Sequence, residues 1–186
     1  MKEAFTPEEF LQLLSQLSVC LEHEGKKTTI ILFGGGALSM YYGARSTTHD
    51  LDVLINGDDR SSIIEAVRRI AADNDTVDDW LNDDGKSLIT DAIVADAQDF
   101  ITLPAITMKV ASAEALLALK AAALRYLPGS HDLEDVRFLI QRLKVTDVEE
   151  VITLAEKYLP QRLLPLSAYN ETMLDVLIEE INKEGN

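Results

Sequence analysis

Two aspartates, Asp50 and Asp52, stand one residue apart, a short distance after an apolar segment that ends in three glycines. Residues 28–33 predict a strand, and residues 37–42, which follow the glycines, predict a short helix. Residues two apart on a strand point to one face, so we expect the two carboxylates side by side and the apolar residues between them facing the core. Like charges at that spacing are costly unless a cation lies between them, and Mg²⁺ prefers oxygen ligands. The pair therefore predicts a metal site.

The glycines indicate the second half of that site. Backbone without Cβ atoms can approach a ligand closely, and the N–H groups at the start of a helix favour an anion, so a phosphate is expected there. The dinucleotide fingerprint is excluded because Ser39 stands where its third glycine is needed. The P-loop is excluded because no Gly-Lys-Ser/Thr follows at the required distance. The structural alternative is that Asp50 begins the strand and Asp52 pairs with Arg45.

These residues resemble the signature of the nucleotidyltransferase (polymerase-β-like) superfamily, in which a glycine turn opening a short helix precedes Asp-x-Asp on a strand. Gly35-Gly36 and Asp50-Leu51-Asp52 carry the match, and residues 45–49 resemble the segment before the aspartates in small bacterial members of the minimal and AbiEii-like type. Residues 116–123 and 131–135 resemble two helical motifs of the same members, with His131 where arginine is usual.

The resemblance implies a Mg²⁺-dependent nucleotidyltransferase that moves an NMP from an NTP to a hydroxyl of tRNA, a protein or a small molecule. It implies one or two Mg²⁺ ions on Asp50 and Asp52. The implied nucleotide contacts are Gly35, Gly36, Ser39, Arg45, Thr48 and Lys120, the last offsetting triphosphate charge. Asp132 or Asp135 would act as a base, or would instead only favour a helix N-terminus. Ser39 and Lys120 have plain alternatives as a polar helix position and a solvent-facing lysine.

Many superfamily members complete the metal site with a third carboxylate on a later strand. Asp91, Asp96 and Asp99 are the candidates, in a stretch whose secondary structure is ambiguous. The resemblance extends to the toxin half of toxin–antitoxin pairs, with a cognate partner protein. Without the third carboxylate, the alternative is a catalytically inactive member that acts as an antitoxin or partner-binding module. A nucleotide-binding sensor is a third hypothesis.

The order of the predicted elements indicates an α/β (α+β) fold, with a nucleotidyltransferase-like mixed sheet flanked by helices over residues 1–111 and a C-terminal helical bundle over 112–186. Strands are expected at 28–33, 50–55 and 106–110, and 93–95 and 99–103 are further strand candidates. Helices are expected at 6–24, 63–71, 112–126, 131–143, 146–159 and 167–183, the first and fifth beginning with capping boxes, Thr6 to Glu9 and Thr146 to Glu149.

The composition limits the classes of partner that the protein can have. The chain has 186 residues and a net charge of -15, which would repel a nucleic-acid backbone. A tRNA acceptor would need a basic patch drawn from Lys26, Lys27, Arg45, Lys120, Arg125, Arg137, Arg142 and Lys144. No apolar run is long enough to span a bilayer and no apolar signal region opens the chain, so a cytoplasmic protein is expected. The single Cys20 is expected as a core thiol, and Trp80 as a core residue or a stacking surface for a base.

Overall fold

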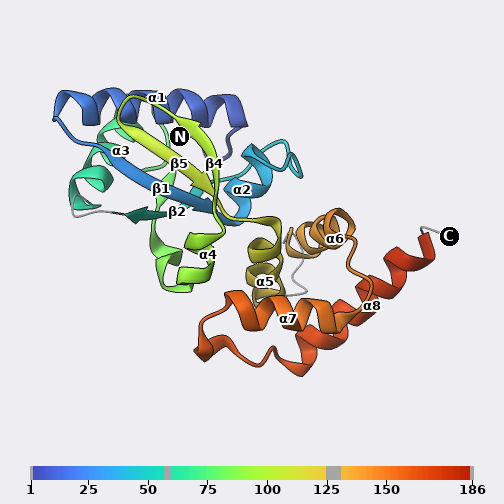
Figure 1. The fold of residues 1–186 in the computed structure, drawn as a ribbon. Helices are drawn as coiled ribbons and strands as arrows, with labels where there is room; N and C mark the ends of the chain where they lie inside the picture. Colours follow the sequence, from blue (N-terminus) through green and yellow to red (C-terminus); the bar gives the residue numbers. More distant parts are fainter. Residues whose placement is uncertain (1, 57–59, 125–130, 185–186) are drawn as a thin grey trace. The chain divides into compact units, whose positions relative to one another are not determined.

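The computed structural model describes residues 2–56, 60–124 and 131–184, which form a mixed α/β fold in two compact units (Figure 1). Unit 1, Met1–Ser87 and Ala97–Ala111, holds the sheet. Unit 2, Leu88–Asp96 and Ser112–Asn186, contains only helices among its described residues. The chain passes between the units after residues 87, 96 and 111, so residues 88–96 group with the helical unit.

The sheet of unit 1 has five strands in the order β3-β2-β1-β5-β4. Their bounds are β1 Thr28–Phe33, β2 Leu51–Asn56, β3 Leu81–Asn82, β4 Gln98–Thr102 and β5 Ile106–Val110. β2 runs antiparallel to β1 and parallel to β3, whereas β5 is parallel to β1 and antiparallel to β4. The aspartate strand β2 therefore lies between β1 and β3, and β4 forms the opposite edge.

The two faces of the sheet differ in burial. Register partners share a face, so Leu32, Val53 and Val110 lie on one face, and all three are fully buried. The other face carries Asp52 and Lys109, which are half-buried, beside their register partners Phe33 and Ile31 on β1, which are buried. The alternation in β2, buried at Leu51, Val53 and Ile55, places Asp52 on the more open face, as its spacing predicts.

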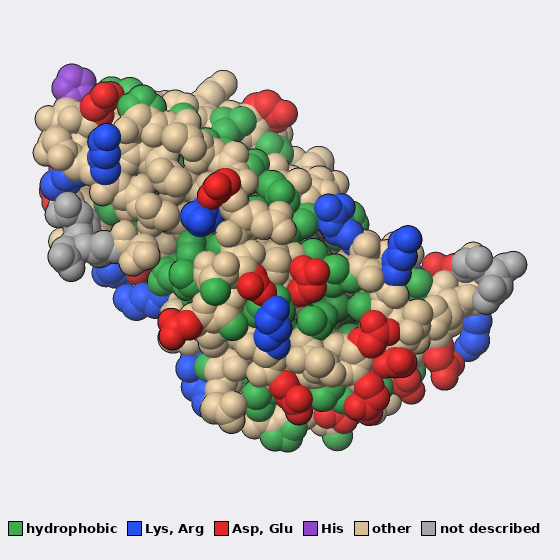
Figure 2. Space-filling view, viewed as in Figure 1, with side chains coloured by type: hydrophobic (Ala, Val, Ile, Leu, Met, Phe, Trp, Pro, Cys, Tyr) green, Lys and Arg blue, Asp and Glu red, His purple; other side chains and the backbone are tan. Residues whose placement is uncertain are grey.

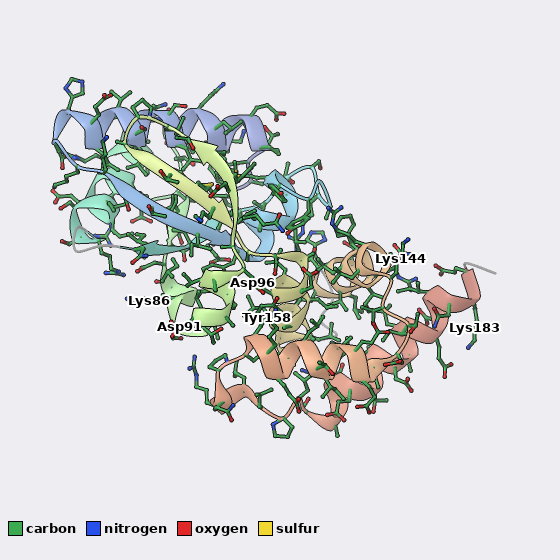
Figure 3. The ribbon with its side chains drawn as sticks, viewed as in Figure 1. Lys86, Asp91, Asp96, Lys144, Tyr158 and Lys183 are labelled. Carbon is green, nitrogen blue, oxygen red and sulfur yellow. The ribbon has the colours of Figure 1, made fainter. Side chains whose placement is uncertain are left out.

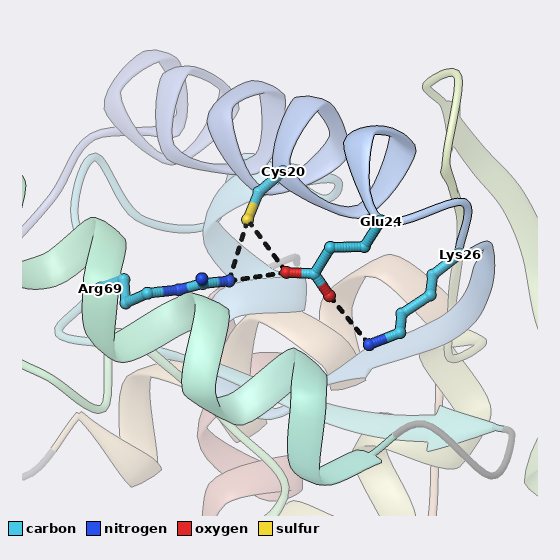
Figure 4. Close-up of polar contacts among 4 residues, drawn as sticks. All are labelled: Cys20, Glu24, Lys26 and Arg69. Carbon is cyan, nitrogen blue, oxygen red and sulfur yellow. Dashed lines mark hydrogen bonds and ion pairs between the residues drawn. The ribbon is translucent and has the colours of Figure 1, made fainter.

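Helices α1 (Pro7–His23) and α3 (Arg60–Asp73) pack against each other in unit 1, while the short α2 (Gly34–Met40) packs on β1 and β2. The predicted capping box of α1 is present in both directions between Thr6 and Glu9. Between α1 and α3, Arg69 Nη2 lies 2.8 Å from Glu24 Oε1 and 3.2 Å from Cys20 Sγ (Figure 4). Cys20 is thus a half-buried thiol beside charged groups, and the prediction of a core thiol is wrong.

Trp80 is a core residue, as one of its two predicted roles requires. Its side chain is fully buried, and its Nε1 donates a hydrogen bond to the carbonyl of Val67 on α3. The indole therefore anchors the segment that leads into β3.

Unit 2 is built around α5. The helices are α4 (Asp91–Ala95), α5 (Ala113–Ala123), α6 (Asp132–Leu143), α7 (Val148–Tyr158) and α8 (Ala168–Glu184), with a 3₁₀ turn over Gln161–Leu163. α5 contacts α6, α7 and α8 through an almost entirely apolar surface. The predicted end of this helix near Tyr126 and the basic residue Arg125 lie outside the described residues.

Residues 93–95 form part of α4, so the strand predicted there is wrong, whereas the strand predicted over 99–103 is confirmed as β4. Tyr158 and Lys157 on α7 hold the end of α4 through Asp96 Oδ2, at 2.6 and 2.7 Å, and Figure 3 shows Asp96 and Tyr158 near each other. Ile93 is buried, so this local packing outweighs the strand preference of its β-branched sequence.

The N-terminus of α7 is capped one residue later than predicted. Asp147 accepts a hydrogen bond from the Glu150 backbone, and Thr146 bonds to the Glu150 side chain instead of capping the helix. Asp and Glu side chains gather over α7 and α8 in the space-filling view (Figure 2). Across the described residues, no helix has both the length and the apolar character that crossing a membrane requires.

Candidate functional site

The two aspartates lie on one face of the sheet. Asp50 directly precedes β2, and Asp52 is paired in register with Phe33 on β1 and Asn82 on β3. Asn82 Nδ2 donates a hydrogen bond of 3.0 Å to Asp50 Oδ2. Since partners on parallel strands share a face, Asp52 and Asn82 point the same way, and the hydrogen bond places the Asp50 carboxylate with them. The geometry is the one that the Asp-x-Asp spacing predicts.

The glycine segment lies directly against these carboxylates. α2 begins at Gly34 and contains all three glycines, so it starts three residues earlier than the predicted helix. Gly34 has φ +64°, and a Cβ placed on it would lie 2.5 Å from Asp52 Oδ2. A Cβ on Gly36 would lie 2.8 Å from Leu51 Cδ2. Glycine therefore lets the start of α2 approach both the Asp52 carboxylate and the core side of β2.

Arg45 and Thr48 complete the surroundings of the glycine segment. A Cβ on Gly35 would lie 3.0 Å from Thr48 Oγ1 and 3.3 Å from Arg45 Nη1, so both polar groups lie over this glycine. The backbone of Thr48 is held by two hydrogen bonds with Phe5, of 2.8 and 3.1 Å. The structure thus brings Gly35, Arg45 and Thr48 together with the aspartate pair, a grouping that the resemblance implies.

Ser39 has a structural role. Its side chain is 3% exposed, and its hydroxyl donates a 3.3 Å hydrogen bond to the Arg45 carbonyl. The hydroxyl holds the loop that carries Arg45, so this geometry fits the plain structural alternative for Ser39 better than the predicted phosphate contact.

The electrostatics of the pair are set mainly by burial. Burial raises the pKa of the Asp50 carboxyl above its usual value, the hydrogen bond from Asn82 opposes that shift, and the nearby charge of Asp79 adds to it. An ionised carboxylate in this place is poorly solvated, so a bound cation would relieve that penalty. Asn82 was missed in the sequence because a two-residue strand shows no hydrophobic period, and Asp79 was missed because it lies in the irregular segment before that strand.

The three candidates for a third carboxylate lie in different parts of the fold. Asp99 lies on β4, with its side chain 87% exposed and 3.2 Å from Lys109 Nζ. Three strand spacings, about 14 Å, separate β4 from β2, so Asp99 does not join the pair. Asp91 and Asp96 belong to unit 2, where Asp96 is engaged with α7. The residue beside Asp52 on the neighbouring strand is Asn82, an amide.

The donor set for a metal is therefore two carboxylates. Within the part of the chain that the structure describes, no three His, Cys, Asp or Glu side chains are arranged to hold a metal ion. Mg²⁺ is commonly bound through one or two carboxylates together with water and substrate phosphates. The Asp50/Asp52 pair, with glycine backbone beside it, fits a Mg²⁺ ion that arrives with a triphosphate.

Lys120 and Asp132 lie in unit 2. Lys120 Nζ is 2.8 Å from Asp135 Oδ2 and 3.1 Å from Asp132 Oδ1. Asp135 is 2% exposed, so the three groups form a largely buried ion-pair cluster that joins α5 to α6. Lys120 is not the solvent-facing lysine of its plain alternative, and the triphosphate role implied for it stays a prediction.

A second polar cluster in unit 1 lies at the β3 edge of the sheet. Arg60, the first residue of α3, makes two hydrogen bonds to the buried carboxylate of Asp83, the residue after β3. Both line a cavity of about 170 Å³ that Asn82 and Asp79 also line. The cavity lies along the β3 edge, and two of its lining residues also act on Asp50: Asn82 through its hydrogen bond and Asp79 through its charge.

No family model, curated protein or solved structure matched the chain. The likeness to the nucleotidyltransferase superfamily thus remains a hypothesis, and the geometry around Asp50 and Asp52 is the observation that bears on it.

Proposed function

We propose that the protein is a divalent-cation-dependent nucleotidyltransferase, which moves an NMP from an NTP to an acceptor hydroxyl. The observation that carries this proposal is the contact between the Asp52 carboxylate and Gly34, with Asp50 on the same face. A carboxylate pair packed on glycine backbone supplies ligands for a cation and, directly beside them, backbone that can approach a phosphate.

The chemistry follows from the roles of these groups. Mg²⁺ would neutralise the triphosphate and the charge that develops on the leaving group. Asp50 and Asp52 would hold the cation, and Arg45 and Thr48, which lie over Gly35, would contact phosphate oxygens. The acceptor oxygen forms a bond to the α-phosphorus while the bond to the bridging oxygen breaks, pyrophosphate leaves, and the hydroxyl proton passes to a base. The resemblance assigns that base to Asp132 or Asp135, but the proposal rests on unit 1 alone.

The charge distribution favours a protein or small-molecule acceptor over tRNA. Acidic residues outnumber basic ones in each unit. Several members of the predicted basic patch form ion pairs: Lys26 with Glu24, Lys120 with Asp132 and Asp135, and Arg137 with Glu180 and Glu184. A surface of this kind repels a nucleic-acid backbone. Among the acceptors that the resemblance implies, a cognate partner protein in a toxin–antitoxin pair fits this surface.

A label-transfer assay tests the proposal. The purified protein is incubated with Mg²⁺ and each α-labelled NTP, with tRNA, candidate partner proteins and small-molecule acceptors in separate reactions. Asp50→Asn/Asp52→Asn should abolish both transfer and Mg²⁺-dependent NTP binding. Asp73→Asn/Asp175→Asn, which removes two exposed carboxylates elsewhere, should leave both unchanged. A wild-type protein that neither transfers label nor binds NTP in the presence of Mg²⁺ would refute the proposal.

The second candidate is a catalytically inactive member that binds a partner, and the amide of Asn82 beside Asp52 favours it. The same assay, with binding of the candidate partner proteins measured beside it, separates the two functions, because an inactive module would transfer no label and would bind its partner equally well with and without the Asp50/Asp52 carboxylates. NTP binding without transfer to any acceptor would favour the nucleotide-binding sensor.

A further inference from the structure

We infer that Asn82 is a positioning residue for Asp50, and that it keeps the Asp50/Asp52 pair a site for a single divalent cation. This inference rests on the proposed function, and it names a residue that neither the motif nor the resemblance assigns. Its basis is the place of Asn82 on β3, beside Asp52 in register and within hydrogen-bonding distance of Asp50.

The orientation of the Asn82 amide is fixed from both ends. Its Oδ1 accepts a hydrogen bond of 3.1 Å from the backbone N–H of Asp84, and its Nδ2 donates to Asp50 at 3.0 Å. The opposite orientation would set the amide oxygen against the carboxylate and the NH₂ group against an N–H, so it would lose both hydrogen bonds. Asn82 therefore always presents a donor to Asp50.

The backbone that carries Asn82 is also fixed. The Trp80 carbonyl accepts a 2.9 Å hydrogen bond from the Leu51 N–H, between the two aspartates, and the Trp80 side chain is locked in the core. Leu81 pairs with Leu51, which ties β3 to β2 at this point. A donor on such a support fixes the plane of the Asp50 carboxylate and leaves lone pairs on its oxygens for a cation.

The choice of an amide also sets the charge of the site. Asn82 orients Asp50 without adding charge, so two ionised carboxylates match one divalent cation. A carboxylate at this position would add a third negative charge on the same face and create room for a second ion. The strand neighbour of Asp52 thus decides how many ions the site holds.

The test measures Mn²⁺ binding through the loss of the free-ion EPR signal, with no nucleotide present. The wild-type protein should bind one ion per chain, and Asp50→Asn/Asp52→Asn should bind none. Asn82→Ala should still bind one ion, with about 10-fold lower affinity, the size expected when a residue that orients a ligand is lost. Asn56→Ala is the matched control: Asn56 is exposed at the far end of β2, and its loss should change neither affinity nor stoichiometry.

Asn82→Asp is the deciding variant. It keeps the size of the side chain and an oxygen for the Asp84 N–H but replaces the donor with a third carboxylate, so it should bind two ions per chain. One ion in Asn82→Asp, two in the wild type, or unchanged affinity in Asn82→Ala would each overturn the inference while leaving the proposed function intact. A wild-type protein without saturable Mn²⁺ binding would overturn the inference and the metal site of the proposed function together.

Discussion

Replacing Gly34 with alanine tests the close contact between α2 and Asp52. The substitution has two penalties. At φ +64° an alanine adopts a left-handed conformation, at about 1 kcal/mol, and its Cβ would lie 2.5 Å from Asp52 Oδ2, where overpacking costs about 1–3 kcal/mol. Together, Gly34→Ala should destabilise unit 1 by about 2–4 kcal/mol.

The matched control is Gly43→Ala. Gly43 has φ +67°, nearly the same backbone conformation, but a Cβ there would have nothing within 4 Å. This control should lose only about 1 kcal/mol, so the difference between the two variants isolates the contact with Asp52. Trp80 is the only tryptophan and is buried in unit 1, so urea unfolding followed by its fluorescence reports on that unit.

Asp52→Ala in the Gly34→Ala background completes the test. Removing the carboxylate removes the atom that the new methyl group meets, so the extra penalty should disappear and leave only the backbone term that Gly43→Ala measures. Equal losses in Gly34→Ala and Gly43→Ala, or an extra penalty that survives the removal of Asp52, would refute the contact that carries the proposed function.

Three further predictions concern buried charges. Because burial raises the folded-state pKa of Asp50, its ionised form lowers stability above the unfolded-state pKa. Asp50→Asn should therefore raise the urea midpoint at pH 7, with a gain that shrinks as the pH falls toward 3.8; a lower midpoint at pH 7 would contradict this. Arg60→Ala removes the main partner of Asp83, whose side chain is 3% exposed, and should lower the urea midpoint followed by Trp80 fluorescence. Because Arg60 lowers the pKa of Asp83, the stability that this ion pair contributes is present above pH 3.8 and should fade as the pH drops through the lowered pKa. A destabilisation by Arg60→Ala that persists fully in acid would count against this explanation. Lys120→Met removes the cation that lies 2.8 Å from the buried Asp135 carboxylate and should cost about 3–5 kcal/mol, read from the helical circular dichroism signal; full stability together with lost nucleotide transfer would show instead that Lys120 binds the ligand.

The sequence predicts the aspartate pair and its surroundings because local signals dominate there. The alternation in β2 is long enough to be read, so the shared face of Asp50 and Asp52 follows from the period of a strand. The capping box at Thr6 is equally local, and it is present. The mixed α/β fold with a helical second half follows from the order of such segments.

What the sequence does not show depends on contacts between distant residues. β3 has two residues and therefore no hydrophobic period. The sequence alone gives no sign that Asn82 contributes to the site, because that contribution depends on the pairing of β3 with β2. The strand predicted over 93–95 fails because α7 holds α4 through Asp96, 61 residues before Lys157. The partners of Lys120 likewise become apparent only when α6 packs on α5.

The path of the chain between the two units bears on how this protein can be dissected. The chain passes from unit 1 to unit 2 after Ser87, returns at Ala97, and leaves again after Ala111, so three peptide links connect the units. A fragment of 112–186 would lack α4, and Tyr158 would lose the hydrogen bonds that its hydroxyl makes to Asp96 and its carbonyl accepts from Thr90. A cut at 111 therefore damages the helical unit, and a fragment meant to fold as that unit needs residues 88–96 joined to it by an artificial linker.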